Sequence, residues 1–329
     1  MAQEFELADS PSDGISSVIF SPSDPALLLS ASWDKHVRLH DVQSNSLRHK
    51  YSHKAAVFDV CFAEPHVAVS GGLDKRVKMV DLNTGQESIL GKHDDAVRNV
   101  VYDPESKTMI SGSWDKTIRQ WDFRQPPSRP AGVQKQSDKV LSLDITPNGH
   151  KLVVAMANRH VFVYDTRNMD ETFQKRESSL KFMTRAVKCM PNGEGYASSS
   201  IEGRIAVEFF DPSEEVQKKK YAFKCHRQTV DGVENVYPVH SLAFHPIFGT
   251  FASGGGDGIV NVWDGYNKKR IRQYPRYPTC IASLSFSPDG QQLAVASSYT
   301  WDELEKDAPT DTIFVRTVAE AEVKPKTQA

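Results

Sequence analysis

The chain has 329 residues, a formal net charge of −2 and a hydrophobic fraction of 39%. These values suit a soluble protein with a substantial core, and without a basic excess a general duplex nucleic-acid partner is not expected. We expect no signal peptide and no membrane span, because no apolar run approaches roughly 20 residues. The four cysteines form no CxxC pair, which predicts buried free thiols in the cytosol or nucleus.

One pattern recurs seven times along the chain. Each copy begins with an alternating stretch that ends in a proline turn, at Pro22, Pro65, Pro104, Pro147, Pro191, Pro246 and Pro288. The differences between successive prolines are 43, 39, 43, 44, 55 and 42 residues. A small-residue strand and a third strand follow, and in the first six copies the third strand closes on Asp41, Asp81, Asp122, Asp165, Asp211 and Asp264. Short alternating strands between such turns predict β structure throughout.

A period in the forties with strands ending in "QWD" and "VWD" resembles the WD-repeat β-propellers. The resemblance implies an all-β fold, a single seven-bladed WD-repeat β-propeller over residues 1–329. Blades are expected to start near residues 13, 55, 95, 138, 185, 238 and 280. We expect residues 4–7 ("EFEL") to supply the outer strand of blade seven, since a propeller must close its sheet edges. A flexible C-terminal tail is expected over about 320–329.

Histidines and aspartates at the blade boundaries follow the family pattern as well. His53 and His93 precede their blades, and Asp74 and Asp115 occupy the turns between the second and third strands. The resemblance implies a hydrogen-bonded His–Asp pair in each of these blades. Blade seven departs from the pattern, because an acidic insertion at 299–311 replaces its turn.

Patterns that suggest catalysis are weak. "SWDK" occurs twice and "SSLK" once, which matches Ser-x-x-Lys, but without the partner motifs that such chemistry needs. The glycine-rich "SGGGDG" at 253–258 aligns with other blade turns and precedes no helix that could hold a phosphate. No HxxxH or HExxH spacing occurs. We therefore expect no catalytic residue, no metal and no cofactor, and an interaction scaffold is the leading class.

Two tryptophans stand on turns that do not require them. The residue before the turn aspartate or its equivalent is Trp33, Leu73, Trp114, Ala157, Ile201 and Gly256 in blades one to six. A structural tryptophan would be expected in most blades, yet it occurs in two. Either the indoles pack locally, or Trp33 and Trp114 are aromatic anchors for a partner segment, a role in which tryptophan is enriched.

Basic residues concentrate in blade five. Arg185, Arg204 and Lys224 come from the first, third and fourth strands of one blade and could converge on a phosphate. Ordinary salt bridges with Glu202 or Glu208 are the alternative. The run 218–220 ("KKK") reads as a solvated loop, with nuclear import as a weaker alternative.

Three stretches are more specific than the repeat: "RESSLKFMTRAVKC", "SSIEGRIAVEFFDPSEEVQKKKYAFKCHR" and "FHPIFGTFASGGGDGIVNVWD". They resemble the family that contains the mitotic-checkpoint propeller Bub-three and the mRNA-export propeller Rae-one. The resemblance implies that Trp33 and Trp114 bind the GLEBS motif of the Bub and BubR checkpoint kinases. It also implies that Arg185, Arg204 and Lys224 contact phosphothreonine in Met-Glu-Leu-Thr repeats of the kinetochore scaffold KNL-one. A lysine at 224 lacks the bidentate fork of arginine.

The checkpoint branch of this family is favoured over the export branch. The segment before "DGISSV" at residue 13 is short, and "DPSEEVQKKKYAFKCHR" resembles the checkpoint member. The resemblance implies a location in the nucleus and at mitotic kinetochores, with inhibitors of the anaphase-promoting complex as further partners. The alternative is a Rae-one-type role in mRNA export and nuclear-pore docking. Direct RNA binding is not expected, because alternation places Tyr221 and Phe223 on the face opposite Lys224.

Overall fold

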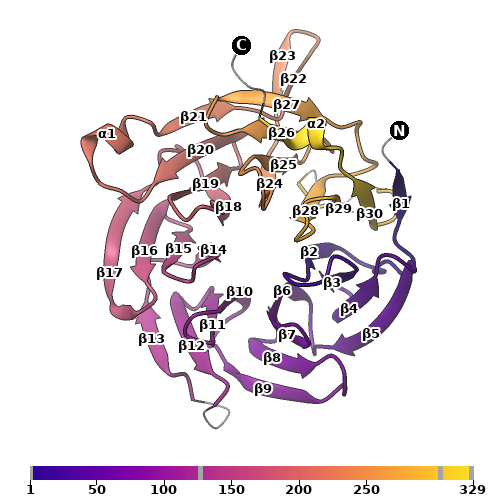
Figure 1. The fold of residues 1–329 in the computed structure, drawn as a ribbon, viewed down its shortest axis with the longest axis vertical. Helices are drawn as coiled ribbons and strands as arrows, with labels where there is room; N and C mark the ends of the chain where they lie inside the picture. The colour runs from indigo at the N-terminus through magenta and orange to yellow at the C-terminus, as the bar shows by residue number, and fades with distance from the viewer. Residues whose placement is uncertain (1–2, 125–128, 303–306, 326–329) are drawn as a thin grey trace.

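The computed structural model describes residues 3–124, 129–302 and 307–325. In this part of the chain, seven four-stranded antiparallel sheets stand around a central axis and close into a ring (Figure 1). Within each sheet we call the strands a to d, from the axis outward. The fold is a seven-bladed β-propeller, which confirms the predicted fold class.

The first three blades follow the repeat pattern of the sequence. Blade one consists of β2 (Ile15–Phe20), β3 (Leu27–Ser32), β4 (His36–Asp41) and β5 (Ser46–Ser52). Blade two consists of β6 (Val57–Glu64), β7 (Val67–Gly72), β8 (Arg76–Asp81) and β9 (Glu87–Lys92). Blade three consists of β10 (Val97–Asp103), β11 (Thr108–Ser113), β12 (Thr117–Asp122) and β13 (Gly132–Lys135).

Blades four and five carry the longest strand and a short helix. Blade four consists of β14 (Val140–Ile145), β15 (Lys151–Met156), β16 (His160–Asp165) and β17 (Asn168–Glu177). Blade five consists of β18 (Thr184–Cys189), β19 (Gly195–Ser200), β20 (Arg204–Phe209) and β21 (Tyr221–Lys224). Helix α1 (Glu214–Gln217) lies between β20 and β21. The lysine run at 218–220 follows this helix and is exposed, with Lys218 paired to Glu214 at 2.8 Å.

The last two blades contain the insertions that disturb the repeat. A hairpin of β22 (Arg227–Val230) and β23 (Val233–Val236) separates blades five and six and accounts for the 55-residue spacing. Blade six consists of β24 (Val239–Phe244), β25 (Phe251–Gly255), β26 (Val260–Asp264) and β27 (Lys269–Gln273). Blade seven consists of β28 (Ile281–Phe286), β29 (Gln292–Ser297), β30 (Thr312–Thr317) and β1 (Glu4–Glu6).

The ring closes where the two ends of the chain share blade seven. Strand β1 pairs antiparallel with β30, with Glu4 opposite Arg316. The Glu4 carboxylate accepts a hydrogen bond from the Tyr277 hydroxyl at 2.6 Å and lies 3.3 Å from the Arg316 guanidinium. Blade seven is also joined to blade one, because Ser283 Oγ accepts the Val18 N–H at 3.0 Å. The N-terminal strand therefore leaves β30 without a free edge.

Close packing between blades explains the small residues of the b strands. A Cβ added to Gly71 of blade two would lie 2.4 Å from Val97 of blade three, and one added to Gly254 of blade six would lie 2.4 Å from Ile281 of blade seven. The inner strand of the next blade packs directly on these glycines, so a larger residue would force the blades apart. The small-residue pattern in the sequence therefore reports the blade interfaces.

The C-terminal segment differs from the prediction. Residues Glu320–Val323 form helix α2, and Val323 is buried in the core of blade six. Thr250 Oγ1 donates a hydrogen bond to the Val323 carbonyl at 2.7 Å. The flexible tail was predicted to begin too early, because the buried Val323 side chain, the Thr250 hydrogen bond and an ion pair of Glu322 with Arg272 at 3.3 Å hold this segment against the blade. The remaining predicted tail, 326–329, lies outside the described residues.

The structure also bears on the predictions from composition. All four cysteines, Cys61, Cys189, Cys225 and Cys280, are free and buried. Burial raises the pKa of the Cys61 and Cys189 thiols, so these thiols are poor nucleophiles. Among the described helices, none has both the length and the apolar character that a membrane crossing requires.

Candidate functional site

The two faces of the disc carry different loops. Because neighbouring strands are antiparallel, the b–c turns share one face with the connections between blades. The a–b and c–d turns share the other face. We call the first the top face and the second the bottom face. Trp33, Trp114, Arg204 and Lys224 all lie at the top face, because each sits in a b–c turn or at the strand end next to one.

Trp33 is exposed although its turn is rigid. Its indole rests on Gly14, where an added Cβ would lie 3.4 Å from Cδ2, and its side chain is 41% exposed. The next residue, Asp34, accepts hydrogen bonds from the His36 N–H and from the Arg38 guanidinium. Although burial opposes it, these bonds lower the pKa of Asp34 to about 2. The aspartate fixes the turn, and the tryptophan is left facing solvent.

Trp114 lies in the equivalent turn of blade three and is partly buried. Its ring packs against Phe58 at a centroid distance of 5.4 Å, and the Lys139 ammonium lies 5.6 Å from the ring centroid. Its buried Nε1–H has no hydrogen-bond acceptor among the described residues. Local packing therefore accounts for much of the Trp114 side chain, and its buried Nε1–H is left without an acceptor in the described residues.

Two further apolar side chains stand at the corresponding turns of neighbouring blades. Leu73 of blade two is 48% exposed and Trp301 of blade seven is 47% exposed. Trp301 has φ +60, a conformation uncommon for a non-glycine residue, and its ring packs 5.7 Å from Tyr299. With Trp33 and Trp114 they form an apolar arc over blades seven, one, two and three. Leu73 was visible when the turns were aligned in the sequence. Trp301 was not found, because the insertion in blade seven prevents the alignment of its turn.

A ring of bulged residues surrounds the axis at the top face. In each inner strand the pairing register shifts at the second residue, which leaves that residue outside the ladder. These residues are Ser16, Phe58, Arg98, Leu141, Arg185, His240 and Ala282. Arg98 makes no hydrogen bond and no ion pair with the described residues. Burial lowers the pKa of Arg98, the charge of the Asp59 carboxylate opposes this shift, and the charge of Arg185 adds to it. Arg98 is therefore a cation that is only partly compensated within the chain.

The predicted basic cluster is only partly assembled. Arg204 and Lys224 lie opposite each other in the pairing of β20 with β21. Arg204 is 3.6 Å from Glu202, and Lys224 has no ion pair in the described chain. Arg227, which the prediction did not include, donates to the Glu202 carbonyl at 2.8 Å, but its charge is paired with Glu234 at 2.8 Å. Arg185 instead lies two strands closer to the axis and turns to the next blade.

Arg185 begins a hydrogen-bonded chain across three blades. Its guanidinium donates to His240 Nδ1 at 2.8 Å, so His240 is protonated on Nε2 and donates from there to Asp302 at 2.8 Å. Burial lowers the pKa of His240, which keeps the imidazole neutral. Burial raises the pKa of the Asp302 carboxyl, but the hydrogen bond from His240 lowers it, and the pKa falls below its usual value.

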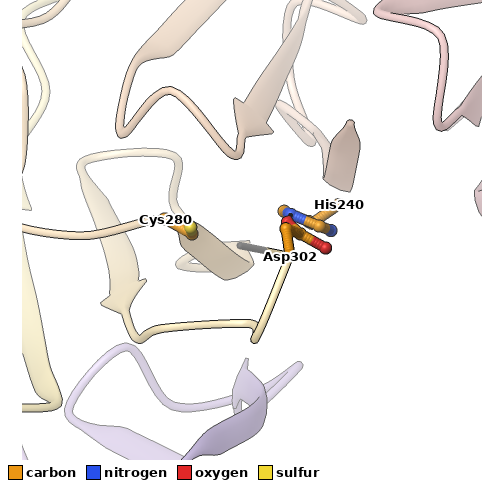
Figure 2. Close-up of side chains that lie close together, drawn as sticks. All are labelled: His240, Cys280 and Asp302. Atoms are coloured by element: carbon orange, nitrogen blue, oxygen red, sulfur yellow. Dashed lines mark hydrogen bonds and ion pairs between the residues drawn. The ribbon is translucent and has the colours of Figure 1, made fainter. Parts of the chain in front are cut away.

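The same residues form a cluster with metal-ligand chemistry. His240, Cys280 and Asp302 have potential ligand atoms within 4.8 Å of one another, and His240 meets Asp302 directly (Figure 2). A metal on His240 Nε2 would displace the proton held there, while Nδ1 is already an acceptor for Arg185. The imidazole would then have to be an anion, and the Cys280 thiol is directed to the Gly256 carbonyl at 3.4 Å. These contacts do not fit a metal site.

Three buried networks have the order of groups found in Ser-His-Asp hydrolases. They are Ser70–His53–Asp74, Ser111–His93–Asp115 and Ser253–His226–Asp257, with Nδ1 on the aspartate and Nε2 on the serine. Each serine Oγ is fully buried, and two of them accept the indole N–H of Trp121 or Trp263. These serines cannot meet a substrate, so the networks fix turns.

Two of these networks contain His–Asp pairs that the sequence predicted, and the structure confirms them. The third, His226–Asp257, was missed. Its two residues are 31 apart rather than 21 or 22, because the β22–β23 hairpin is inserted between them. Like His53 and His93, His226 comes just after the d strand of its blade, and this shared position is the signal that could have identified it.

Comparison with known proteins assigns the class first. Residues 4–41, 85–122 and 218–264 match the WD domain, G-beta repeat. A solved structure titled "Structure of U3-55K" shares the fold with a TM-score of 0.82, over 96% of this chain and 98% of that one, at 16% identity. The fold and the repeats therefore define a WD-repeat β-propeller.

Full-length relatives then give the family. Mitotic checkpoint protein BUB3.1 of Arabidopsis thaliana is 56% identical over 324 residues, which cover 98% of this chain and 94% of the relative. Mitotic checkpoint protein bub3 of Dictyostelium discoideum is 47% identical, covering 98% and 97%. The mRNA export factor GLE2 of Chaetomium thermophilum is 35% identical, covering 92% and 86%. The chain belongs to the Bub3 family of mitotic-checkpoint WD-repeat proteins, and this family and its fold point to a scaffold role.

Proposed function

We propose that this propeller is a non-catalytic adaptor of the spindle assembly checkpoint. It binds the GLEBS motif of the Bub and BubR kinases on its top face and brings them to kinetochores by binding phosphorylated Met-Glu-Leu-Thr repeats of KNL-one. Inhibitors of the anaphase-promoting complex are further proposed partners. The observation that carries the proposal is the apolar arc of the top face, in which Trp33, Leu73 and Trp301 are exposed and Trp114 is partly buried.

Exposed aromatic residues on fixed backbone are suited to binding a peptide. Little backbone freedom is lost on association, because aspartates such as Asp34 already hold the turns. Tryptophan that becomes buried at an interface is the residue type most enriched among binding hot spots. Arg98, which makes no hydrogen bond or ion pair with the described residues, adds a cation to the same face. Together they favour a peptide with apolar anchors and at least one carboxylate.

The basic patch on blade five supports the second partner. Lys224 has no ion pair in the described residues, and Arg204 has only a 3.6 Å contact with Glu202. Two adjacent cations with little compensation favour a phosphate dianion over a neutral hydroxyl. Phe182 and Met183, which are exposed in the connection before blade five, offer an apolar surface beside this patch. We propose that Arg185 adds long-range attraction from the axis rather than a bidentate contact.

One affinity capture from mitotic extract tests the adaptor role and its branch. The full chain on beads is expected to retain checkpoint kinases, and Trp33→Ala with Trp114→Ala is expected to lose them. Ile247→Ala, which removes an exposed apolar side chain from the bottom face, is the matched control and should retain them. Recovery of nucleoporins in place of kinases would replace the proposal with a Rae-one-type function.

Phosphate reading is tested separately with peptides. Arg204→Ala should weaken binding of a Met-Glu-Leu-phosphothreonine peptide by at least about tenfold, because a charge-assisted bond contributes about 1.5–3 kcal/mol. Binding of the unphosphorylated peptide should change little. Lys219→Ala, which removes an exposed lysine that makes no ion pair in the described chain, is the control for net charge. Equal weakening of both peptides would exclude phosphate recognition by Arg204.

A further inference from the structure

A second surface lies on the bottom face, away from every residue proposed above to bind a partner. Ile247 is 65% exposed and Tyr266 is 56% exposed. Both line a cavity of about 340 Å³ between blades five and six. Its wall comes from the a–b turns of both blades and the c–d turn of blade six, and Phe209, Phe244 and Phe251 line its interior. The volume is near the lower limit of ligand pockets.

The turn that carries Ile247 is fixed by a buried histidine. His245 Nδ1 accepts the backbone N–H groups of Ile247 and Phe248, both at 3.2 Å. Its Nε2 donates to the Gly290 carbonyl of blade seven at 3.1 Å, and its ring stacks on Phe248. Burial lowers the pKa of His245, which keeps the ring in the neutral form that these bonds require. Ile247 is therefore presented by a rigid turn and not by a loose loop.

The rim of the cavity carries one uncompensated negative charge. Tyr266 Oη donates to the Glu194 carboxylate at 3.2 Å, and Asn192 Nδ2 donates to the same carboxylate at 2.8 Å. Glu194 is exposed and has no ion pair with any described residue. Among the described residues, no lysine, arginine or histidine lines the cavity. The nearby Lys324 ammonium lies 5.9 Å from the Phe248 ring centroid and is paired with Glu320 at 2.7 Å. The two hydrogen bonds hold the carboxylate beside the opening, where it can receive a cation.

We propose that this cavity is a docking site for a linear peptide that has an aliphatic side chain next to a lysine or arginine. The aliphatic group enters between Ile247 and Tyr266, and the cation meets Glu194. Fixed apolar walls with a single oriented carboxylate select this pairing over an acidic or a purely polar segment. The site lies on the face opposite the apolar arc, so a bottom-face partner and a top-face partner can be bound together. The inference does not rest on the proposed top-face function.

Methyl-labelled full-length protein and three synthetic nonapeptides test the proposal. The probes are Gly-Ser-Gly-Leu-Arg-Lys-Gly-Ser-Gly, the same peptide with Ala for Leu, and the same peptide with Asp-Glu for Arg-Lys. The first probe should shift the Ile247 methyl resonance to saturation with a Kd below about 1 mM. The other two should bind at least about fivefold more weakly, since each lacks one of the two contacts.

Variants separate the two contacts. Ile247→Ala should weaken the Leu-Arg-Lys probe by about fivefold or more, read from the Tyr266 ring resonances. Leu73→Ala, an equally simple truncation on the top face, should leave this binding unchanged. Glu194→Lys should reverse the charge preference, so that the Asp-Glu probe binds better than the Arg-Lys probe. Both bottom-face variants should bind a GLEBS peptide like the wild-type chain.

Several results would overturn the proposal. They are the lack of a saturable Ile247 shift up to 1 mM of the first probe, equal binding of the acidic probe, or no reversal in Glu194→Lys with a retained melting temperature. A shift of the same resonances on dilution of the protein alone would show that a second copy of the chain occupies the cavity instead.

Discussion

Replacing Trp33 by alanine should cost the top-face site about 2 kcal/mol of binding free energy. A tryptophan side chain offers up to about 250 Å², and 41% exposure of Trp33 leaves roughly 100 Å² for a partner to cover. At about 25 cal/mol per Å² this area corresponds to about 2.5 kcal/mol. An alanine would still bury part of this surface, so a loss of about 2 kcal/mol, or roughly 30-fold in Kd, is expected.

The assay is titration calorimetry of the full chain with a synthetic GLEBS peptide. Part of the Trp33 indole packs on Gly14, so the melting temperature is measured as well, and the titration is run well below it. Ile247→Ala removes a more exposed side chain from the bottom face and serves as the control. A change in Kd below about threefold for Trp33→Ala in a folded variant would refute the role of Trp33 as an anchor, because it would mean that the exposed indole stays uncovered.

Three further outcomes are expected. Burial and the Arg38 charge lower the pKa of His40 to about 4, so the unfolded chain takes up a proton below pH 6.5 that the folded chain takes up only near pH 4. About 3 kcal/mol of stability should therefore be lost as the pH falls from 6.5 to 4. In urea unfolding, the His40→Gln variant should lack this part of the dependence of stability on pH. Ser111→Ala leaves His93 Nε2 and Trp121 Nε1 without a partner and should lower the unfolding free energy by about 3 kcal/mol. Ser44→Ala, on an exposed turn, should change the unfolding free energy by less than about 0.5 kcal/mol. Equal effects would show that the buried network contributes no more to stability than an exposed serine. Arg98→Met should weaken binding of an acidic GLEBS peptide by about tenfold with little change in the melting temperature, because Arg98 makes no hydrogen bond or ion pair with the described residues and only the charge of Asp59 offsets its burial. A variant that melts earlier but binds normally would contradict this.

Most of the fold could be predicted from the sequence because each blade repeats the same local solution. The proline turns, the aspartates that end the c strands and the small residues of the b strands all recur at nearly constant spacing. Gly71 and Gly254 are small because the next inner strand would collide with a Cβ. The C-terminal helix α2 was not predictable in this way, since it occurs once and is held by the burial of a single valine, Val323.

The candidate site was predictable where its residues stand out within a single turn of the sequence. It was not predictable where the site depends on contacts between residues that are distant in the sequence. Trp33 and Trp114 could be recognised because each breaks the pattern of its own repeat. Arg98 looks like any strand arginine in sequence. Its significance comes from a bulge and from the lack of a hydrogen bond or ion pair with the described residues. Arg185 was grouped with Arg204 by sequence position, but the bulge at the start of β18 turns it to His240.

Within the "SWDK" turns, the aspartate stabilises the backbone and the tryptophan is not needed for that, so the fold tolerates a tryptophan at this position. In blade three, His93, Thr117 and Arg119 all engage Asp115, so the turn is stable without help from the indole. Trp33 can then keep its ring exposed without loosening its turn, because Asp34 rather than the indole holds the backbone. An exposed apolar side chain on a turn that does not need it costs the free protein stability that a bound partner would recover. Leu73 meets the same description, which is why we propose that both residues belong to one top-face site.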